Sequence, residues 1–351
     1  MSRQEPPCTR IDWSSESRLN LCICVPTFNR VRCLEQLLQS IRLNAPQCDV
    51  LVLDNASDDG TEHFMRSLAH AGRVRYDRNT VNRGAIANLL DVVAKAQSEW
   101  VLIMSDDDVL RMDLDFIDSI DSDNVDAILL GRCDGDAELN FLRDWPYIDA
   151  SATGHARGAA YTFRTLAELF DAGRCLGAAF TLISGVVVRR EAWLRSEAEL
   201  RSGPCAQEYA RSLFPHSWII INLMKHGSAV VVKDQPVVMA RHGNDRVCDN
   251  NVLGRALLDI REFESVASTL LQSDRRAAAG LLGLVGRHIQ NHVFPRAFAA
   301  IYQRARYGAT EWALFSQRAV RYLTFAQRTF PSLIPYPVLK QVYRFYRRFV
   351  A

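Results

Sequence analysis

Short apolar runs alternate with amphipathic stretches between residues 19 and 110, and this alternation restricts the fold more than any other feature of the chain. The apolar runs are LNLCICV, VLVLD and EWVLIM, which are typical of buried strands. Stretches with apolar residues at helical spacing lie between them, VRCLEQLLQSIRL and AIANLLDVVAKA. Strands that alternate with helices in this way predict an α/β fold, with a mostly parallel sheet flanked by helices.

Polar residues follow these strand-like runs directly. The four polar clusters are residues 27–30, 54–61, 79–84 and 105–108. In open α/β sheets, ligands bind at the carboxyl ends of the strands. We therefore expect these clusters, which are far apart in the sequence, to converge in space and form the ligand site.

The composition is that of a folded protein. Of the 351 residues, 48% are hydrophobic and 23% are charged, which excludes disorder over most of the chain. No apolar run reaches the roughly 18 residues of a membrane span, and the N-terminus lacks the apolar centre of a secretory signal, so we expect a cytoplasmic protein. The nine cysteines are an odd number without a C-x-x-C pair, which favours reduced thiols over a disulfide framework or a zinc site.

Charge is distributed unevenly along the chain. Residues 295–351 contain ten Arg or Lys and one acid, a formal charge of +9, so the rest of the chain carries −7. This asymmetry predicts an acidic body and a basic region that meets an anionic partner. The arginines are interleaved with Trp, Phe, Tyr and Leu, so a helix could place rings and guanidinium groups along a membrane surface. The alternative is a helical subdomain packed on the acidic body. Nothing else in the sequence suggests a nucleic-acid surface.

Asp106, Asp107 and Asp108 follow an apolar run and would repel one another without a cation or solvent. Mg²⁺ or Mn²⁺ bound together with a diphosphate is a common reason for such a cluster. The alternative is a solvated turn or helix cap, where Asp is also favoured. Asp54 ends another strand-like run, where a carboxylate could accept hydrogen bonds from a base or a ribose, and Arg83 could contact phosphate.

Two histidines follow apolar segments. His242 comes just after a strand-like run, where an imidazole could complete a metal site begun by the aspartates. His216 lies at a helix start beside Trp218, where it could act as a base toward a sugar stacked on the indole. For either residue, a surface position or a satisfied place in the core is the commoner role of a lone histidine.

Six motifs together resemble a known family. They occur in the order VPTFNR, VLDNASDDGT, NTVNRGAIAN, SDDDVL, ISGVVVRREAW and ARHGN. This order and spacing resembles the family 2 inverting glycosyltransferases, and within that family the chain is similar to the abequosyltransferase-like bacterial enzymes of O-antigen and capsule assembly. The resemblance covers roughly residues 19–245. It implies a Rossmann-like GT-A fold and transfer of a sugar from a nucleotide-diphospho-sugar to an acceptor hydroxyl, with inversion and with Mn²⁺ or Mg²⁺.

The resemblance also implies roles for individual residues. Pro26, Thr27 and Phe28 would border the nucleotide base, Asp54 would hydrogen-bond to it, and Arg83 would lie near the base or the phosphates. In one register of the family's D-x-D element, Asp106 contacts the ribose and Asp107 binds the metal. In the other register, Asp106 and Asp108 are the two outer carboxylates. The first register is favoured because the family usually continues with one more polar residue and an apolar pair. His242 matches a histidine that often adds a metal or phosphate contact.

The chain departs from the family pattern at the catalytic base. The family commonly has a Glu-Asp pair about a dozen residues before the glycine that ends the next helix, and counting back from Gly227 gives Pro215 and His216. Either His216 is the base, or Glu208 reaches in from the preceding loop, or the site is impaired. We favour His216, because imidazole has an ordinary pKa of about 6.5 and can accept a proton from an acceptor hydroxyl.

These inferences divide the chain into a flexible lead-in (1–18), a nucleotide-sugar-binding half (19–130), an acceptor-binding half of the same domain (131–245) and a helical, basic C-terminal region (246–351). The expected partners are the donor, a glycan or lipid-linked glycan acceptor, and the anionic inner face of the cytoplasmic membrane. A sugar-nucleotide-binding or scaffold protein without a base is the competing hypothesis. An oxidoreductase is disfavoured because no G-x-G-x-x-G follows the first strand.

Overall fold

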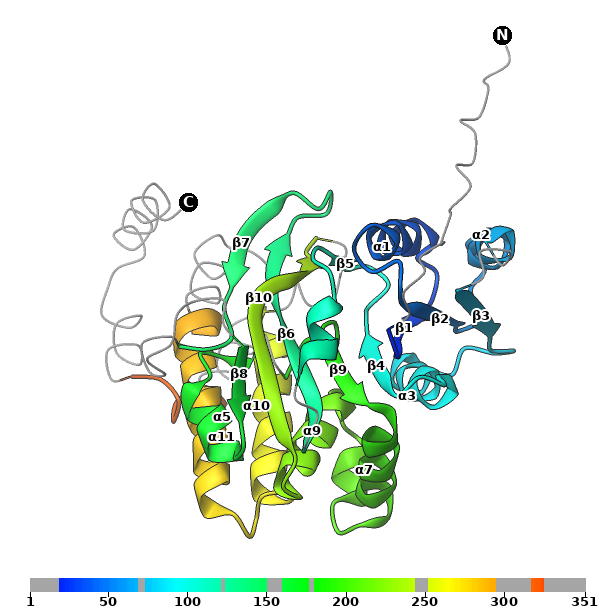
Figure 1. Ribbon diagram of the computed structural model, residues 1–351. Coiled ribbons are helices and arrows are strands. Elements are labelled where there is room, and N and C mark those ends of the chain that lie inside the picture. Colours follow the sequence, from blue (N-terminus) through cyan, green and yellow to red (C-terminus); the bar gives the residue numbers. More distant parts are fainter. Residues whose placement is uncertain are drawn as a thin grey trace, which may run out of the picture.

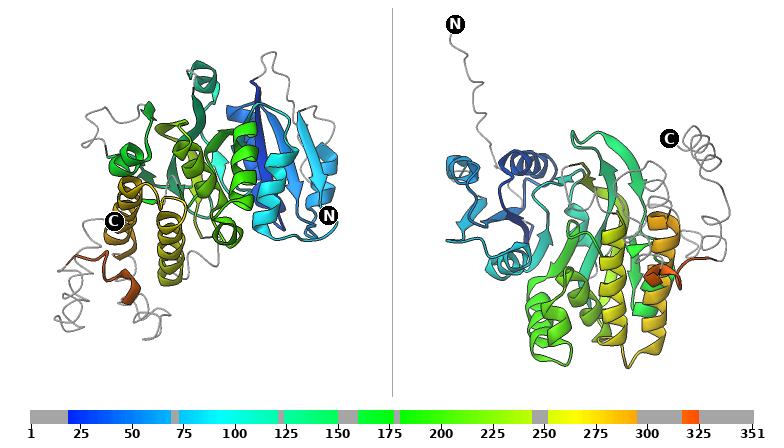
Figure 2. Two further views of the ribbon diagram at one scale, coloured as in Figure 1. Left: turned by 90° about the horizontal axis from the view of Figure 1, so that it is seen from below. Right: turned by 180° about the vertical axis from the view of Figure 1, so that it is seen from behind.

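The computed structural model describes residues 19–68, 73–120, 124–149, 160–176, 180–243, 252–294 and 317–324. The lead-in and most of the basic tail lie outside these ranges. The described residues form one ten-stranded sheet with helices on both faces, as Figures 1 and 2 show. This arrangement confirms the α/β fold expected from the sequence.

The first half of the sheet is parallel. Its order is β3-β2-β1-β4, formed by β1 (Leu21–Thr27), β2 (Asp49–Asp54), β3 (Val74–Arg78) and β4 (Trp100–Ile103). Each of these strands therefore ends at the same edge of the sheet, and the register places Thr27 opposite Asp54.

The second half of the sheet is mixed. β6 and β10 run parallel to β4, whereas β9, which lies between β4 and β6, runs antiparallel to both neighbours. β5 and β8 pair with β10, and β7 pairs with β6, all three antiparallel. The bounds of these strands are β5 (Val109–Leu110), β6 (Val125–Gly135), β7 (Phe141–Trp145), β8 (Ala160–Phe163), β9 (Val186–Arg189) and β10 (Ala229–Arg241). The expected boundary at residue 130 falls inside β6, so both halves share one sheet.

Helices cover both faces of the sheet. α1 (Val31–Asn44), α2 (Thr61–Leu68) and the short 3₁₀ helix η1 (Asp115–Ser119) belong to the core on one face. The other face carries α3 (Ala85–Lys95), α5 (Leu166–Ala172), α7 (Arg190–Ser202), α8 (Ala206–Ala210), α9 (Pro215–Lys225), α10 (Val252–Ser268) and α11 (Arg275–His288), which continues into a π-helical turn, η2 (Ile289–Val293).

The helix over residues 31–44 shows how the pattern produces the packing. Leu34, Leu37, Leu38 and Ile41 are fully buried, and their spacing places them on one face of α1. They pack on the residues of β1 and β2 that point to the same side of the sheet, such as Ile23.

The sequence between Ala229 and Arg241 has two short apolar runs and predicts two short strands, and this prediction is wrong. The structure has a single strand, β10, with a shift of register against β6 between Lys233 and Val238. A side chain at Gly131 would place its Cβ 2.3 Å from the carbonyl oxygen of Gln235, so this irregular part of β10 lies directly against the glycine.

The C-terminal helices α10 and α11 pack on the body of the protein. Phe263 and Leu281 are fully buried in the same core as the residues of α9. This part of the C-terminal region is therefore a helical subdomain on the sheet. In the ranges that the structure describes, no helix has the length and apolarity needed to cross a membrane.

Candidate active site

The polar clusters after the parallel strands converge, as expected. The amide of Asn55 donates to the carbonyl of Thr27 at 2.9 Å, and the amide of Asn79 donates to the carbonyl of Asp54 at 2.8 Å. Thr27 Oγ1 donates to Asp106 Oδ2 at 2.8 Å. These bonds join the ends of β1, β2 and β3 to the turn after β4, so residues up to 79 positions apart form one continuous edge.

Asp54 is the most enclosed carboxylate of this edge, with no exposed area. Tyr76 Oη donates to its Oδ2 at 2.7 Å, and the Arg78 guanidinium lies 3.3 Å from the same oxygen. The amide and hydroxyl of Ser57 donate to Oδ1 at 2.9 and 2.5 Å. Both oxygens therefore have protein partners, and Asp54 fixes the turn after β2.

A chain of asparagine amides connects this turn to the start of α3. Asn55 Nδ2 donates to Asn82 Oδ1 at 2.8 Å, and Asn79 Nδ2 donates to Asn55 Oδ1 and Asn88 Oδ1 at 3.1 and 3.0 Å. Gly84 precedes the helix with a positive φ of 86°, a conformation that favours glycine. The asparagine side chains of the motif NTVNRGAIAN therefore form a hydrogen-bonded framework together with Asn55.

Of the three consecutive aspartates, the first two share one arginine as a partner. Asp106 accepts from Thr27 and from Arg30 Nη1, the latter at 3.2 Å. Asp107 accepts from the same Arg30 nitrogen at 2.8 Å and from Ser105 Oγ at 2.5 Å. A single guanidinium thus lies against two carboxylates, at the end of β1 and the start of α1.

Asp108 faces the opposite way, toward β9 and β10. It accepts a hydrogen bond from Ser184 Oγ and one from the Arg241 amide, at 3.0 Å in the second case. Ser184 Oγ also accepts the amide of Ser105 at 2.9 Å. Gly185, with a φ of 92°, follows this serine at the start of β9, so the ISG motif turns the chain and presents the hydroxyl.

Burial changes the acidity of this cluster. Burial, and after it the neighbouring charge of Asp107, raises the pKa of Asp106 to about 6 and that of Asp108 to about 7. Arg30 and the hydroxyl of Thr27 act against this rise at Asp106. Since negative charge is disfavoured here, a cation placed between the carboxylates and a bound anion would be stabilised.

Arg241 and Arg132 belong to the site, although the sequence analysis did not single them out. Arg241 Nε donates to the carbonyl of Asp107 at 2.8 Å, and its Nη2 donates to Gln36 Oε1 at 2.7 Å, so it fastens the aspartate turn to α1. Arg132, on β6, lies 3.3 Å from the buried carboxylate of Asp134. Arg241 is the arginine of the ARHGN motif, so the sequence contained a signal for it. No motif marks Arg132.

His242 lies beside the aspartate turn but pairs with another carboxylate. Its Nε2 is 3.1 Å from Asp134 Oδ1, and Arg143 is 2.7 Å from Asp134 Oδ2. Burial opposes the charge of Asp134, but His242 and the neighbouring arginines outweigh it and hold the pKa of this carboxyl below its usual value.

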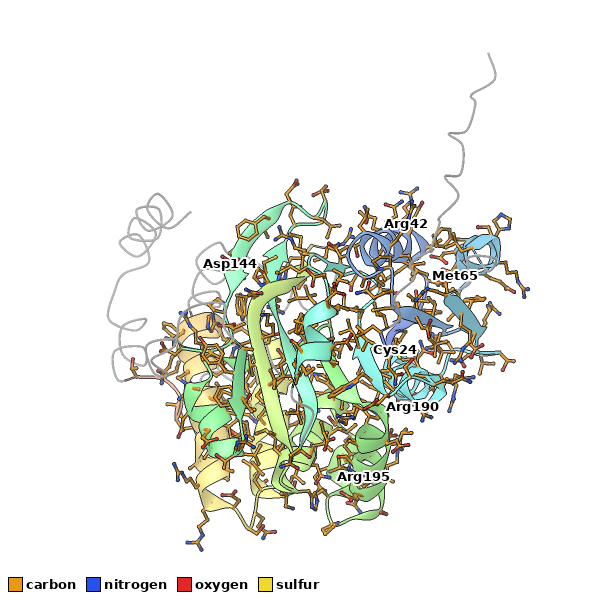
Figure 3. All side chains as sticks on the ribbon, in the orientation of Figure 1. Cys24, Arg42, Met65, Asp144, Arg190 and Arg195 are labelled. Carbon is orange, nitrogen blue, oxygen red and sulfur yellow. The ribbon has the colours of Figure 1, made fainter. Side chains whose placement is uncertain are left out.

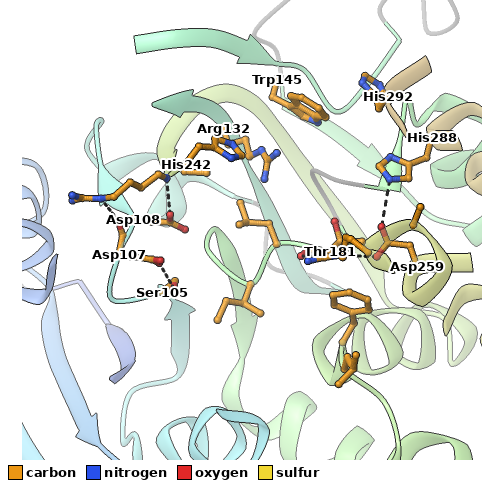
Figure 4. A pocket seen from close by; sticks show the side chains of 18 of the residues that line it. Ser105, Asp107, Asp108, Arg132, Trp145, Thr181, His242, Asp259, His288 and His292 are labelled. Carbon is orange, nitrogen blue, oxygen red and sulfur yellow. Dashed lines mark hydrogen bonds and ion pairs between the residues drawn. The ribbon is translucent and has the colours of Figure 1, made fainter. Parts of the chain in front are cut away.

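Part of the aspartate turn lines a cavity of about 340 Å³. Figure 4 shows Ser105, Asp107 and Asp108 on one side of it and Asp259, His288 and His292 on the other. His242 lines the first side, together with Arg30 and Arg241. Figure 3 shows the side chains on the ribbon, with the buried Cys24 on β1.

Other predicted site residues lie away from this cavity. Phe28 is 41% exposed, Pro26 is half-buried, and neither lines the cavity, although both neighbour Thr27. Arg83 is exposed and forms an ion pair with Asp91 of α3, while its amide donates to Asn55 Oδ1 at 2.9 Å. These positions lie along the strand ends where a nucleotide base could be held.

Neither predicted base lines the cavity. His216 is 0% exposed in the first turn of α9, with its ring edge-on to Phe214, and burial lowers its pKa to about 3. Glu208 is half-buried on α8 and also lies outside the lining. His216 therefore lies in the core beside the ring of Phe214, and it does not line the cavity.

The donor set fits a metal ion that arrives with a diphosphate. In the described part of the chain, no group of three or more His, Cys, Asp or Glu residues could hold an ion alone. Asp107 lines the cavity, and among the described residues its carboxylate accepts hydrogen bonds from Ser105 and Arg30. Mg²⁺ commonly takes one or two carboxylates and completes its shell with phosphate oxygens and water.

Comparisons with known proteins agree with this geometry. Residues 22–191 match the model of glycosyl transferase family 2. The abequosyltransferase RfbV of Salmonella typhimurium is 26% identical over 262 residues, which cover 71% of this chain and 74% of that protein.

Solved structures share the fold. The Staphylococcus aureus TarS fragment 1–349 has a TM-score of 0.56 at 12% identity, covering 93% of this chain and 91% of that one. The same fragment in complex with UDP-GlcNAc has a TM-score of 0.56 at 13% identity, over 87% and 80%. The mannosyltransferase PcManGT of Pyrobaculum calidifontis, in complex with GDP-Man and Mn²⁺, has a TM-score of 0.52 at 17% identity, over 98% and 91%.

Proposed function

Because residues 22–191 form a glycosyltransferase family 2 domain, we propose that this chain transfers a sugar from a nucleotide-diphospho-sugar to an acceptor hydroxyl, with inversion at the anomeric carbon. The observation that carries the proposal is the aspartate turn, in which Asp107 and Asp108 line the cavity beside Arg30 and Arg241. Carboxylates and guanidinium groups at the carboxyl edge of a parallel sheet are suited to a diphosphate and its counter-ion.

The donor is proposed to lie along the strand ends. Pro26, Thr27 and Phe28 border the base, and Arg83 is available to the base or the phosphates. Asp54 was expected to hydrogen-bond to the base, but its enclosed carboxylate is proposed instead to hold the turn beneath it. Asp106 is oriented by Thr27 and Arg30 toward the ribose. This is the first register of the D-x-D element, and it is supported by the lining of the cavity, which includes Asp107 but not Asp106.

A divalent ion is proposed to be held by Asp107, with Asp108 and His242 close by. When bound, Mn²⁺ or Mg²⁺ would neutralise the charge that develops on the leaving nucleoside diphosphate. Asp108 is the weaker candidate because its carboxylate is turned toward β9 and β10, where Ser184 and the Arg241 amide hold it. His242 is weaker for the same reason, since it pairs with Asp134.

The acceptor is proposed to be a growing bacterial surface glycan, of the O-antigen or capsule type. The relative RfbV, an abequosyltransferase, supports this class of reaction. The competing hypothesis, a sugar-nucleotide-binding or scaffold protein, rested on the loss of the usual base at residues 215 and 216. It predicts donor binding without turnover.

Two measurements test the proposal. A panel of nucleotide sugars is screened for thermal stabilisation with and without Mn²⁺, because a ligand at 100 times its dissociation constant adds about 2.7 kcal/mol. Release of the free nucleoside diphosphate is then followed with the best donor and a glycan acceptor. Stabilisation together with acceptor-dependent release supports the enzyme. Stabilisation without release favours the binding protein, and no stabilisation by any donor overturns both.

Peripheral attachment to the inner face of the cytoplasmic membrane is proposed from the sequence of the tail, most of which lies outside the described residues. Residues 295–351 contain ten basic residues and one acidic residue. Near an anionic surface each basic residue adds about 1 kcal/mol, and salt weakens the attraction. We expect the protein to co-sediment with anionic vesicles at low salt. We expect this binding to be lost when Arg344, Arg347 and Arg348 are replaced by Gln.

A further inference from the structure

The wall of the cavity opposite the aspartate turn contains residues from outside the family 2 domain. Asp259 belongs to α10, His288 to α11 and His292 to the turn that follows. Figure 4 shows these side chains across the cavity from Asp107 and Asp108. An inverting transfer requires the acceptor to attack from the side opposite the leaving diphosphate, so this wall is where an acceptor hydroxyl would need a base.

Asp259 is held firmly within this wall. It is 3% exposed, and its Oδ1 accepts from Arg255 Nε at 2.9 Å. Its Oδ2 lies 3.5 Å from His288 Nε2. Two cationic neighbours from two helices therefore fix the carboxylate in one orientation while it lines the cavity.

His288 lies between two acidic groups. Burial alone would lower its pKa, but the carboxylate of Asp259 and the thiol of Cys175 outweigh burial and raise this pKa to about 9. Burial alone would raise the pKa of Cys175, but His288 and His292 outweigh it and lower this pKa to about 5. Trp145 Nε1 also donates to Cys175 Sγ, at 3.2 Å. His288 is therefore a cation at neutral pH.

The other proton acceptors that line the described cavity are accounted for. Asp107, Asp108 and His242 lie on the side of the aspartate turn and would face the phosphates. His292 packs its ring against Trp145, with centroids 4.8 Å apart. Asp259 is the remaining carboxylate on the acceptor side.

We propose that Asp259 is the catalytic base of the transfer, and that His288 is its positioning residue. The inference rests on the proposed glycosyltransferase function. The Asp259 carboxylate takes the proton of the acceptor hydroxyl while the acceptor oxygen forms its bond to the anomeric carbon. The bond from that carbon to the diphosphate oxygen breaks, and the electron pair leaves with the nucleoside diphosphate. The C-terminal helices thus supply the group that residues 215 and 216 lack.

The test compares two buried carboxylates of the same helix. Asp259→Asn keeps the shape of the side chain and is expected to lower turnover by about 10²- to 10⁴-fold, as loss of a general base does, while the dissociation constant of the donor stays within about threefold. Glu262→Gln is the matched control. Glu262 is 5% exposed on α10, accepts from Trp218 Nε1 at 2.7 Å, and does not line the cavity. The turnover of the Glu262→Gln variant is expected to remain near that of the wild type.

His288→Gln separates positioning from folding. If His288 orients Asp259 as a cation, the turnover of the wild type falls as pH rises through about 9. The His288→Gln variant is slower than the wild type and lacks this decline. An Asp259→Asn variant that binds donor and turns over within about threefold of the wild type overturns the assignment. In that case the proposed function stands, because the wild type still transfers sugar. A wild type that binds no donor overturns the proposed function instead.

Discussion

Arg30 Nη1 lies 2.8 Å from Asp107 Oδ2, and both residues line the cavity. The same nitrogen is 3.2 Å from Asp106 Oδ1. The guanidinium therefore balances the charge of two carboxylates. Because the proposed metal ion would bind the carboxylate of Asp107, we expect Arg30 and the metal to compete when no donor is bound.

The first prediction concerns this competition. Arg30→Gln removes the internal cation, so the affinity for Mn²⁺ in the absence of nucleotide is expected to rise about tenfold, which titration calorimetry measures. Arg66→Gln is the control, because Arg66 is exposed and pairs only with Glu62 on α2. An unchanged Mn²⁺ affinity in Arg30→Gln would show that the two cations use different oxygens.

Donor binding is expected to depend on Asp107. Asp107→Ala should abolish the Mn²⁺-dependent part of nucleotide-sugar binding, and Asp106→Ala should only weaken binding, because Asp106 is assigned to the ribose. The fold should persist, since these carboxylates contribute little apolar packing. Asp118→Asn, an exposed acid on η1, is the control. Calorimetry in which neither EDTA nor Asp107→Ala changes donor affinity would contradict the assignment.

Ser184 is expected to stabilise the turn without touching the donor. It donates to Asp108 and accepts the amide of Ser105, so Ser184→Ala leaves two buried polar groups without this partner. The free energy of unfolding should fall by about 1 to 3 kcal/mol in urea denaturation. Ser119→Ala, which removes one exposed hydroxyl on η1, should cost much less. Equal losses in the two variants would mean that the Ser184 hydroxyl has no special role.

The parallel half of the sheet could be predicted because its signals are local. The spacing of Leu34, Leu37, Leu38 and Ile41 specifies a buried helix face, and the polar residues after each strand indicate a common edge. The aspartate turn was found for the same reason. The single bent strand β10 was not, because its irregularity depends on the close approach to Gly131, a contact that no short pattern encodes.

The acceptor side of the cavity could not be predicted for a related reason. Asp259 and His288 are 29 positions apart on two helices, and Cys175 comes from a third segment. No motif marks any of the three, so only the packing of α10 against α11 reveals that they meet. His216 shows the reverse: a histidine at a helix start suggested a base, but the residue is fully buried, with its ring edge-on to Phe214.

The last prediction tests whether His216 is a residue of the core. Burial lowers its pKa to about 3, so the folded protein keeps it neutral while the unfolded chain takes up a proton below pH about 6.5. Stability from this group is therefore complete at pH 7.5 and is lost as pH falls toward 3; at pH 5 the loss is about 2 kcal/mol. His216→Leu should lack this loss. In urea denaturation, the free energy of unfolding of the wild type should therefore fall by about 2 kcal/mol more than that of the variant between pH 7.5 and 5. Turnover at pH 7.5 should stay within about threefold. A fall of 10²-fold or more, with donor affinity unchanged, would return the role of base to His216.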